Sequence, residues 1–125
     1  MIMMRILLVD DHIIFRKGVA ALLSNREDMT IVGEAGNGLE AIQTARELLP
    51  EVILMDINMP QCNGLEATRR IKQIRPELPI VATTANTYDE NYIACREAGC
   101  DGFLTKPLQF RKMFELMQSF FDMQA

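Results

Sequence analysis

The sequence has few of the residues that build disulfide frameworks and thiolate metal sites. Three cysteines and one histidine, His12, occur among its 125 residues. The cysteines, Cys62, Cys95 and Cys100, are odd in number and form no CxxC pair. We therefore expect neither a disulfide framework nor a zinc site, and we interpret the cysteines as free thiols.

Long apolar runs and strong positive charge are also missing. No apolar run approaches the roughly 20 residues that cross a bilayer, and neither terminus combines a basic region with a signal-length apolar core. We therefore expect a cytoplasmic protein that does not bind a membrane. The formal net charge of -4 argues against direct binding to nucleic acid.

What the chain does contain is typical of a globular domain, with 49% apolar and 24% charged residues. No linker, low-complexity segment or internal repeat divides the sequence. Residues 1–125 are therefore expected to form one domain with a core of its own.

Apolar runs of strand length alternate with amphipathic segments of helix length. The expected strands lie at residues 5–10, 30–35, 51–56, 80–84 and 102–107, and the expected helices at 13–24, 37–49, 64–74, 88–99 and 108–123. The residues expected on the apolar faces of the first two helices are Phe15, Val19, Leu22, Leu39, Ile42 and Leu49. Because crossovers between parallel strands are right-handed, this alternation predicts a parallel sheet with helices on both faces.

Polar side chains stand at the carboxyl ends of four of the expected strands. They are Asp10 and Asp11 after the first, Asp56 at the end of the third, Thr83 and Thr84 at the end of the fourth, and Lys106 in the fifth. The carboxyl ends of parallel strands share one edge of the sheet, where ligands bind at the reversal of strand order. Four separate segments are therefore expected to meet in one pocket.

The residue types in this pocket suit phosphate chemistry. Three carboxylates repel one another unless they share a cation, and one or two carboxylates with a carbonyl and waters are the usual ligands of Mg²⁺. Lys106 adds a positive charge and Thr84 a hydroxyl group, so that a tetrahedral trianion fits beside a nucleophilic carboxylate. We interpret Asp56, which ends an apolar strand and projects into solvent-reachable space, as that nucleophile.

Over essentially its whole length the sequence resembles the receiver domain of bacterial two-component response regulators. The resemblance rests on the segments ILLVDDH, ILMDINMPQCNGLEA, VATTAN and GFLTKP, in the order and approximate spacing of that family. It implies a flavodoxin-like (βα)5 three-layer sandwich with strand order 2-1-3-4-5. The chain is expected to be either a stand-alone receiver or one excised from a longer regulator. The segments VDDH and VGEAGNGLEAI resemble receivers that precede a helix-turn-helix DNA-binding domain, which favours excision.

The resemblance implies a role for each charged residue of the pocket. Asp56 is implied to be the phosphoacceptor, with Lys106 in contact with the phosphoryl group. Asp10 and Asp11 are implied to position Mg²⁺, Asp11 directly and Asp10 mainly through water. Asp56 and the backbone carbonyl of Asn58 complete the implied metal ligands, and Mg²⁺ is the implied cofactor.

The resemblance also implies a switch beside the pocket. Thr84 is the expected switch hydroxyl in preference to Thr83, because Ala85 follows it as in the family pattern. Phe103 is the expected switch aromatic, and Pro107 is expected to follow a cis peptide bond. Phosphorylation is expected to remodel the face formed by the fourth helix, the fifth strand and the fifth helix.

The same resemblance implies the partners. A sensor histidine kinase or phosphotransfer protein is the expected phosphodonor, and the remodelled face is expected to control an output domain or partner and is a candidate for homodimerisation. DNA is expected to be bound only through an output domain absent from this chain. The domain is expected to assist its own phosphorylation and dephosphorylation without being an enzyme, with Asn58 and Asn86 as candidates for controlling hydrolysis.

Two alternatives belong to other classes of protein. A phosphatase of the haloacid dehalogenase type needs a second aspartate two places after the nucleophile, where this chain has Asn58. A binding module that keeps the receiver shape without phosphorylation predicts decay of the acidic pocket, whose expected members are present. Three further features are interpreted as structural: His12 opens a helix, the GNG at 36–38 starts another, and the basic run at 69–75 is a solvated helix face.

Overall fold

The computed structural model describes residues 3–59, 63–85 and 89–124, with the side chains of residues 89, 90 and 121–124 excepted. Cys62 and Asn86, which entered the sequence-based predictions, lie outside the described residues. None of the helices in the described segments has the length and apolar character that a membrane crossing requires.

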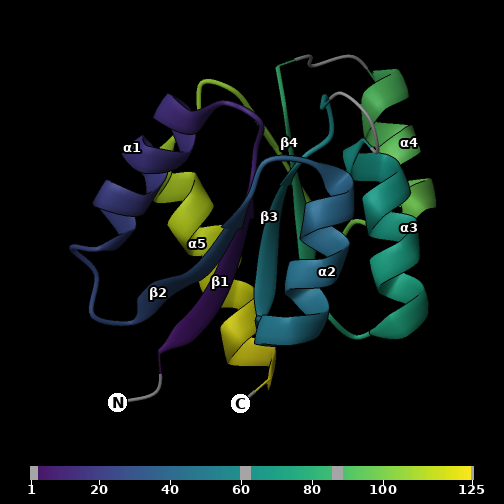
Figure 1. The fold of residues 1–125 in the computed structure, drawn as a ribbon. Coiled ribbons are helices and arrows are strands. Elements are labelled where there is room, and N and C mark those ends of the chain that lie inside the picture. The colour runs from purple at the N-terminus through teal and green to yellow at the C-terminus, as the bar shows by residue number, and fades with distance from the viewer. Residues whose placement is uncertain (1–2, 60–62, 86–88, 125) are drawn as a thin grey trace.

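Strands and helices alternate strictly along the described chain. The strands are β1 (Met4–Val9), β2 (Met29–Ala35), β3 (Val52–Asp56), β4 (Ile80–Thr84) and β5 (Gly102–Thr105), and the helices are α1 (Ile13–Leu23), α2 (Gly38–Leu48), α3 (Gly64–Ile74), α4 (Asp89–Ala98) and α5 (Phe110–Gln124). The strands pair in parallel in the order β2-β1-β3-β4-β5. Figure 1 shows α1 and α5 on one side of the sheet and α2, α3 and α4 on the other. The predicted flavodoxin-like sandwich is confirmed.

The central strands are apolar throughout because both of their faces are covered. In β1, Leu7 and Val9 belong to the core under α2, α3 and α4, whereas Ile6 and Leu8 belong to the core under α1 and α5. In β3, residues 52–55 divide in the same alternating way. Successive side chains of a strand point to opposite faces, so a strand buried on both sides needs an unbroken apolar run.

The predicted apolar face of α2 is wrong at two of its three positions. Leu39 and Leu49 are 53% and 57% exposed, and the side chains buried against the sheet are Ala41 and Ala45, with Ile42 packed beside them. Residues two apart lie about 200° apart around a helix, so burying Ala41 turns Leu39 toward solvent. Leu49 follows the helix in a left-handed conformation, with φ of 49°.

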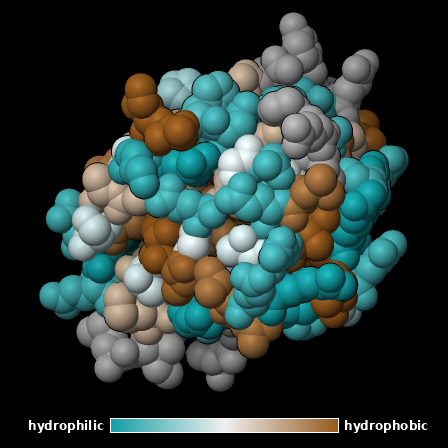
Figure 2. Space-filling view, viewed as in Figure 1, coloured by the Kyte–Doolittle hydropathy of each residue, from teal (hydrophilic) through white to brown (hydrophobic). Residues whose placement is uncertain are grey.

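In α1 the prediction is wrong at one position. Leu22 is 41% exposed and its neighbour Leu23 is fully buried. Phe15, Val19 and Leu23 follow one another at intervals of four residues, so they share the face that packs on β1 and α5. On the side drawn in Figure 2, apolar surface occurs as separate patches among hydrophilic side chains, as is usual for a protein surface.

Short connections fix the helix starts near the carboxyl edge of the sheet. The side chain of Asn37 accepts a hydrogen bond from the backbone N–H of Glu40, so the GNG segment starts α2 as predicted. At α3 a Cβ atom on Gly64 would collide with the backbone oxygen of Asp56. Glycine therefore permits the start of α3 to lie directly against the end of β3. The Lys106–Pro107 peptide is cis, as predicted, and β5 ends before it at Thr105.

Candidate functional site

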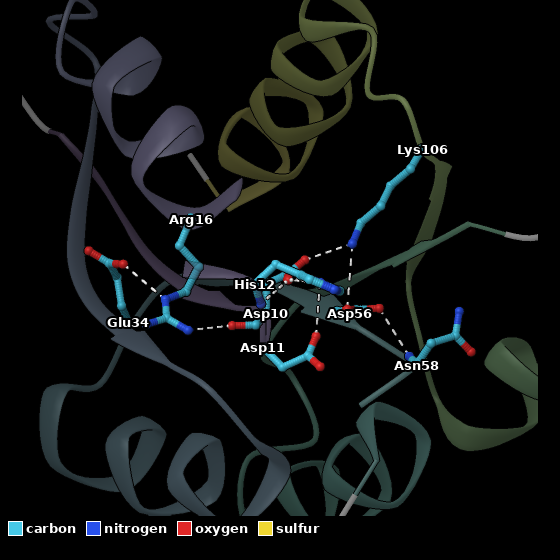
Figure 3. A network of polar contacts seen from close by, with 8 residues as sticks. All are labelled: Asp10, Asp11, His12, Arg16, Glu34, Asp56, Asn58 and Lys106. Atoms are coloured by element: carbon cyan, nitrogen blue, oxygen red, sulfur yellow. Dashed lines mark hydrogen bonds and ion pairs between the residues drawn. The ribbon is translucent and has the colours of Figure 1, made fainter. Parts of the chain in front are cut away.

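Three charged side chains from three strand ends meet at the carboxyl edge of the sheet. Nζ of Lys106 lies 2.8 Å from Oδ2 of Asp10 and 3.5 Å from Oδ2 of Asp56. Figure 3 shows the lysine reaching down from beyond β5 to both carboxylates. The ring of Phe15 lies 4.4 Å from Nζ and covers the ammonium group from the α1 side. The predicted convergence of β1, β3 and β5 on one site is therefore present.

Both paired carboxylates are enclosed. Asp10 is 0% exposed and Asp56 is 2% exposed, so the expectation that Asp56 projects into solvent-reachable space is wrong for this conformation. Neighbouring groups lie against both oxygens of the Asp56 carboxylate: the backbone N–H of Asn58 donates to Oδ1, and Nζ of Lys106 lies 3.5 Å from Oδ2. A ligand reaching Asp56 must therefore displace or reorient neighbouring groups.

Asp11 and His12 complete the acidic end of the site. Asp11 is half-buried, and its Oδ1 atom is buried without a hydrogen bond to any described residue. Nδ1 of His12 lies 3.1 Å from that oxygen and 3.2 Å from Oδ1 of Asp10, contacts that become ion pairs when the imidazole is protonated. His12 opens α1 on the surface as predicted, and its position among the carboxylates is an additional finding.

The charge and geometry of this cluster fit a hard divalent cation. Ligand atoms of Asp10, Asp11, His12 and Asp56 all lie within 4.8 Å of one another. Among the described residues, the cluster contains three carboxylates, and Lys106 pairs with two of them, so negative charge is in excess. An oxygen-rich, acidic cluster with one unsatisfied carboxylate oxygen is the donor set that Mg²⁺ prefers.

The surroundings shift the pKa values of two central groups. Burial raises the pKa of the Asp56 carboxyl, as do the negative charges of Asp10 and Asp11, and the N–H of Asn58 and the charge of Lys106 only partly oppose this. Burial alone would lower the pKa of the Lys106 ammonium. Its hydrogen bond to Asp10 and the charge of Asp56 outweigh that effect and raise it. Lys106 is therefore a permanent positive charge in the site.

Asn58 links the third and fourth strands beside Asp56. Its backbone N–H donates to Oδ1 of Asp56 at 3.0 Å, and its side-chain Nδ2 donates to Oγ1 of Thr84 at 2.9 Å. Thr83 pairs with Asp56 in the ladder and accepts a backbone hydrogen bond from Ile57 through its carbonyl oxygen. Thr83 therefore contacts the segment after Asp56 through its backbone, whereas Thr84 contacts it through its side-chain hydroxyl.

Phe103 lies away from the carboxylates, in β5. Its ring packs edge-on against Tyr92 of α4, with centroids 5.6 Å apart and an interplanar angle of 84°. Tyr92, Cys95, Phe103 and Leu116 help to line a cavity of about 190 Å³ between α4, β5 and α5. The predicted switch aromatic is thus half-buried and has an aromatic partner on the neighbouring helix.

The basic run in α3 is a solvated face only in part. Arg69 and Arg70 are exposed and pair with Glu66, as expected for a surface helix. Lys72 instead reaches Asp101, and Arg75 donates to the carbonyl oxygen of Pro50. The sequence-based interpretation is therefore wrong for Lys72 and Arg75, which tie α3 to other parts of the chain.

Sequence reasoning missed two residues that belong to the site. Arg16 donates from Nη1 to the backbone oxygen of Asp10 and from Nε to Glu34 of β2, as drawn in Figure 3. The available signal was the position of Arg16, one turn after His12, on the part of α1 that follows the end of β1.

A five-stranded parallel sheet covered by helices on both faces, with an acidic cluster and a lysine at its carboxyl edge, defines the class of doubly wound α/β domains. Residues 6–118 match the response regulator receiver domain family, and the chain belongs to that family. It is 37% identical over 119 residues to the response regulator GacA of Pseudomonas viridiflava, an alignment that covers 95% of this chain and 56% of GacA. The chain spans about half the length of the curated relatives it matches.

Solved structures agree with this assignment. A LuxR-family two-component response regulator from Aurantimonas sp. superimposes with a TM-score of 0.88 at 32% identity, over 94% of this chain and 84% of that one. The response regulator domain of Thermotoga maritima CheB gives a TM-score of 0.83 at 34% identity, over 96% and 95% of the two chains. The chain is therefore a receiver domain of the two-component signalling type, which sets aside the haloacid dehalogenase alternative.

Proposed function

We propose that Asp56 accepts a phosphoryl group from a phosphohistidine on a sensor histidine kinase or phosphotransfer protein. The observation that carries the proposal is the placement of Lys106 against both Asp56 and Asp10 at the carboxyl edge. An oxygen of the Asp56 carboxylate attacks phosphorus, a P–O bond forms, and the P–N bond to the partner's imidazole breaks. The imidazole nitrogen keeps the bonding electron pair and takes a proton.

Mg²⁺ is the proposed cofactor, held by Asp10, Asp11, Asp56 and the backbone carbonyl of Asn58. When bound, it offsets the negative charge of the carboxylates and of the transferring group. Lys106 contributes a second positive charge, because its raised pKa keeps the ammonium protonated. Charge neutralisation from two sides permits a carboxylate to approach an anionic donor.

Thr84 and Phe103 form the proposed switch. The Thr84 hydroxyl, which accepts a hydrogen bond from Asn58, turns to donate to an oxygen of the new phosphoryl group. Phe103 then moves into the space that the Thr84 side chain leaves, and it loses its contact with Tyr92. The phosphoryl group favours this state only through the contacts that it gains there, so the change is a shift of population.

The remodelled α4-β5-α5 face is the proposed output surface and a candidate for homodimerisation. The chain covers about half of its curated relatives, so we infer that residues 1–125 are one receiver domain of a longer cytoplasmic regulator. A DNA-binding helix-turn-helix domain is the proposed output. The receiver also assists its own dephosphorylation, with Asn58 and Asn86 as the positions to test.

The test is intact-protein mass spectrometry after incubation with acetyl phosphate, with and without Mg²⁺. The expected result is one Mg²⁺-dependent phosphoryl adduct in the wild type and none in Asp56→Asn, which removes the nucleophile while keeping the shape of the side chain. Labelling of Asp56→Asn at the wild-type level would show that another residue is the phosphoacceptor. Absence of an adduct with both acetyl phosphate and a phosphorylated kinase would favour a module that signals without phosphorylation.

A further inference from the structure

Arg16 joins three structural elements at the back of the acidic site. Its side chain is 16% exposed and extends from α1 toward the ends of β1 and β2. Nη1 donates to the backbone oxygen of Asp10 at 2.6 Å, and Nε donates to Oε1 of Glu34 at 3.1 Å. Figure 3 shows one guanidinium group making both contacts.

The oxygen that Arg16 contacts belongs to the peptide unit that joins Asp10 to Asp11. This unit is planar, so fixing its carbonyl direction also fixes the direction in which the chain continues into Asp11. On the other side of Asp10, its backbone N–H donates to the carbonyl oxygen of Ala35 at 3.0 Å. Asp10 is therefore held through both of its backbone groups, once by the sheet and once by Arg16.

The direction of Asp11 matters because its side chain is not fixed by hydrogen bonds of its own. Its buried Oδ1 atom has no hydrogen bond to the described part of the chain, and the nearby Nδ1 belongs to His12, whose side chain is 68% exposed. The backbone that carries Asp11 is therefore the main element that aims this carboxylate. Two side chains hold that backbone: Arg16 contacts the carbonyl oxygen before Asp11, and Oδ1 of Asp10 accepts the backbone N–H of His12 after it at 2.8 Å.

The guanidinium of Arg16 lies close to Gly36 and Glu34. A Cβ atom on Gly36 would lie 3.3 Å from Nη1, so glycine at this position leaves room for Arg16. Glu34 is fixed in β2 opposite Leu8 of β1, and its second oxygen lies 3.6 Å from Nζ of Lys17. The two donors of arginine stand at a fixed angle, which lysine cannot reproduce.

We propose that Arg16 is a positioning residue of the metal site, which holds the Asp10–Asp11 peptide in the orientation that Mg²⁺ binding requires. The proposal rests on the proposed function, because it assumes that the acidic pair binds Mg²⁺. Groups that orient metal ligands from outside the coordination sphere change metal affinity by about 10- to 100-fold when they are removed.

The test measures the Mg²⁺ dissociation constant of the whole chain by NMR titration, following the backbone amide signals of residues near the site. Arg16→Gln removes the positive charge that assists both contacts. Arg16→Lys keeps the charge but lacks the two donors at a fixed angle. Lys17→Gln is the matched control, because it lies on the same helix and loses a contact to the same Glu34 but does not touch Asp10. Thermal unfolding of each metal-free variant separates loss of stability from loss of affinity.

We expect the Mg²⁺ dissociation constant to rise about tenfold in Arg16→Gln, to rise less in Arg16→Lys, and to stay within about twofold in Lys17→Gln. Phosphorylation by acetyl phosphate should require more Mg²⁺ in Arg16→Gln but approach the wild-type rate at saturating Mg²⁺. A folded Arg16→Gln with the wild-type dissociation constant would overturn the positioning role alone. A wild type that binds no Mg²⁺ would contradict the proposed function, and the positioning role with it.

Discussion

Two lysine–aspartate pairs at opposite ends of the sheet differ in what surrounds them. At the carboxyl edge Nζ of Lys106 lies 2.8 Å from Asp10, and at the start of β4 Nζ of Lys72 lies 2.6 Å from Asp101. Asp10 is fully buried, whereas the side chain of Asp101 is 38% exposed. The same Asp101 oxygen that contacts Lys72 also accepts the backbone N–H of Ile80 at 2.9 Å.

We interpret Lys72–Asp101 as a structural pair and Lys106–Asp10 as the proposed functional pair. Lys72 and Asp101 balance each other, and together they connect α3, the start of β4 and the entry to β5. Around Lys106, the described residues include three carboxylates and an oxygen without a hydrogen bond. Excess negative charge and a buried carboxylate oxygen without a hydrogen bond do not stabilise a folded chain. They therefore indicate a site that binds a cation.

The largest expected effect comes from replacing Lys106, with the same replacement of Lys72 as the comparison. Lys106→Met should lower the rate of Mg²⁺-dependent phosphorylation by acetyl phosphate about 100-fold, because one of the groups that neutralise the transferring phosphoryl is lost. Lys72→Met should leave that rate within about twofold and lower the unfolding free energy by no more than about 1 kcal/mol. The rate is followed as the growth of the phosphoryl adduct in intact-protein mass spectra.

The wild-type chain and Asp56→Asn are the controls in the same series. Equal phosphorylation rates for Lys106→Met and the wild type would show that the pair at the carboxyl edge is also structural. A large loss of phosphorylation rate in Lys72→Met, with the fold intact, would show that the Lys72–Asp101 pair also contributes to function.

Removing one aspartate from each cluster should change stability in opposite directions. Asp11→Asn should raise the unfolding free energy of the metal-free chain by about 1 kcal/mol, because one of three mutually repelling carboxylates disappears. Its Mg²⁺ affinity should fall at least about tenfold. Asp101→Asn should lower the unfolding free energy by about 0.5 to 1 kcal/mol, since the pair is partly exposed, and should leave Mg²⁺ binding unchanged.

Urea unfolding in EDTA and Mg²⁺ titration measure the two quantities separately. A loss of stability in Asp11→Asn would mean that the acidic cluster is satisfied within the folded chain, and that its charge excess does not indicate a ligand. Asp101→Asn then serves as the reference for a variant with a structural defect only.

The sequence made the functional pair predictable and left the structural pair hidden. Asp10 and Lys106 directly follow apolar strands, and all such ends meet at one edge of a parallel sheet, so their convergence followed from the alternation. Lys72 sits in a basic run of α3, and nothing local distinguishes it from its exposed neighbours Arg69 and Arg70. The contact of Arg16 with Glu34 was missed for a similar reason, because it depends on how α1 packs across to β2.

Helix orientation was the other part of the fold that local pattern did not determine. In α2 the leucines suggested one face, but Ala41 and Ala45 lie against the sheet. Apolar side chains on either face of a helix fit the helical period equally well. Which face packs on the sheet depends on the space between the helix and the sheet. Strands that are buried on both faces leave no such choice. The side chains that they bury were therefore predicted more accurately than the buried faces of the helices.

The smallest expected effect concerns two buried thiols beside the structural pair. Burial raises the pKa of Cys95 to about 12 and also raises that of Cys100, which directly precedes Asp101. In the unfolded chain thiols ionise near pH 8.5, so below that pH both states keep the proton. As pH rises from about 8.5 toward 12 the unfolded state loses the proton first, and folding stability falls.

At pH 9 this loss should amount to about 0.8 kcal/mol for Cys95 relative to pH 7 and to no more than that for Cys100, measured by urea unfolding at both pH values. The double variant Cys95→Ala/Cys100→Ala should show a correspondingly smaller dependence on pH, whatever its absolute stability. Asp101→Asn should keep the wild-type dependence if the neighbouring core stays closed, since burial is the main cause of the raised thiol pKa values. A loss of that dependence in Asp101→Asn would show that the structural pair also keeps solvent away from Cys95 and Cys100, and would extend its role from joining strands to sealing this end of the core.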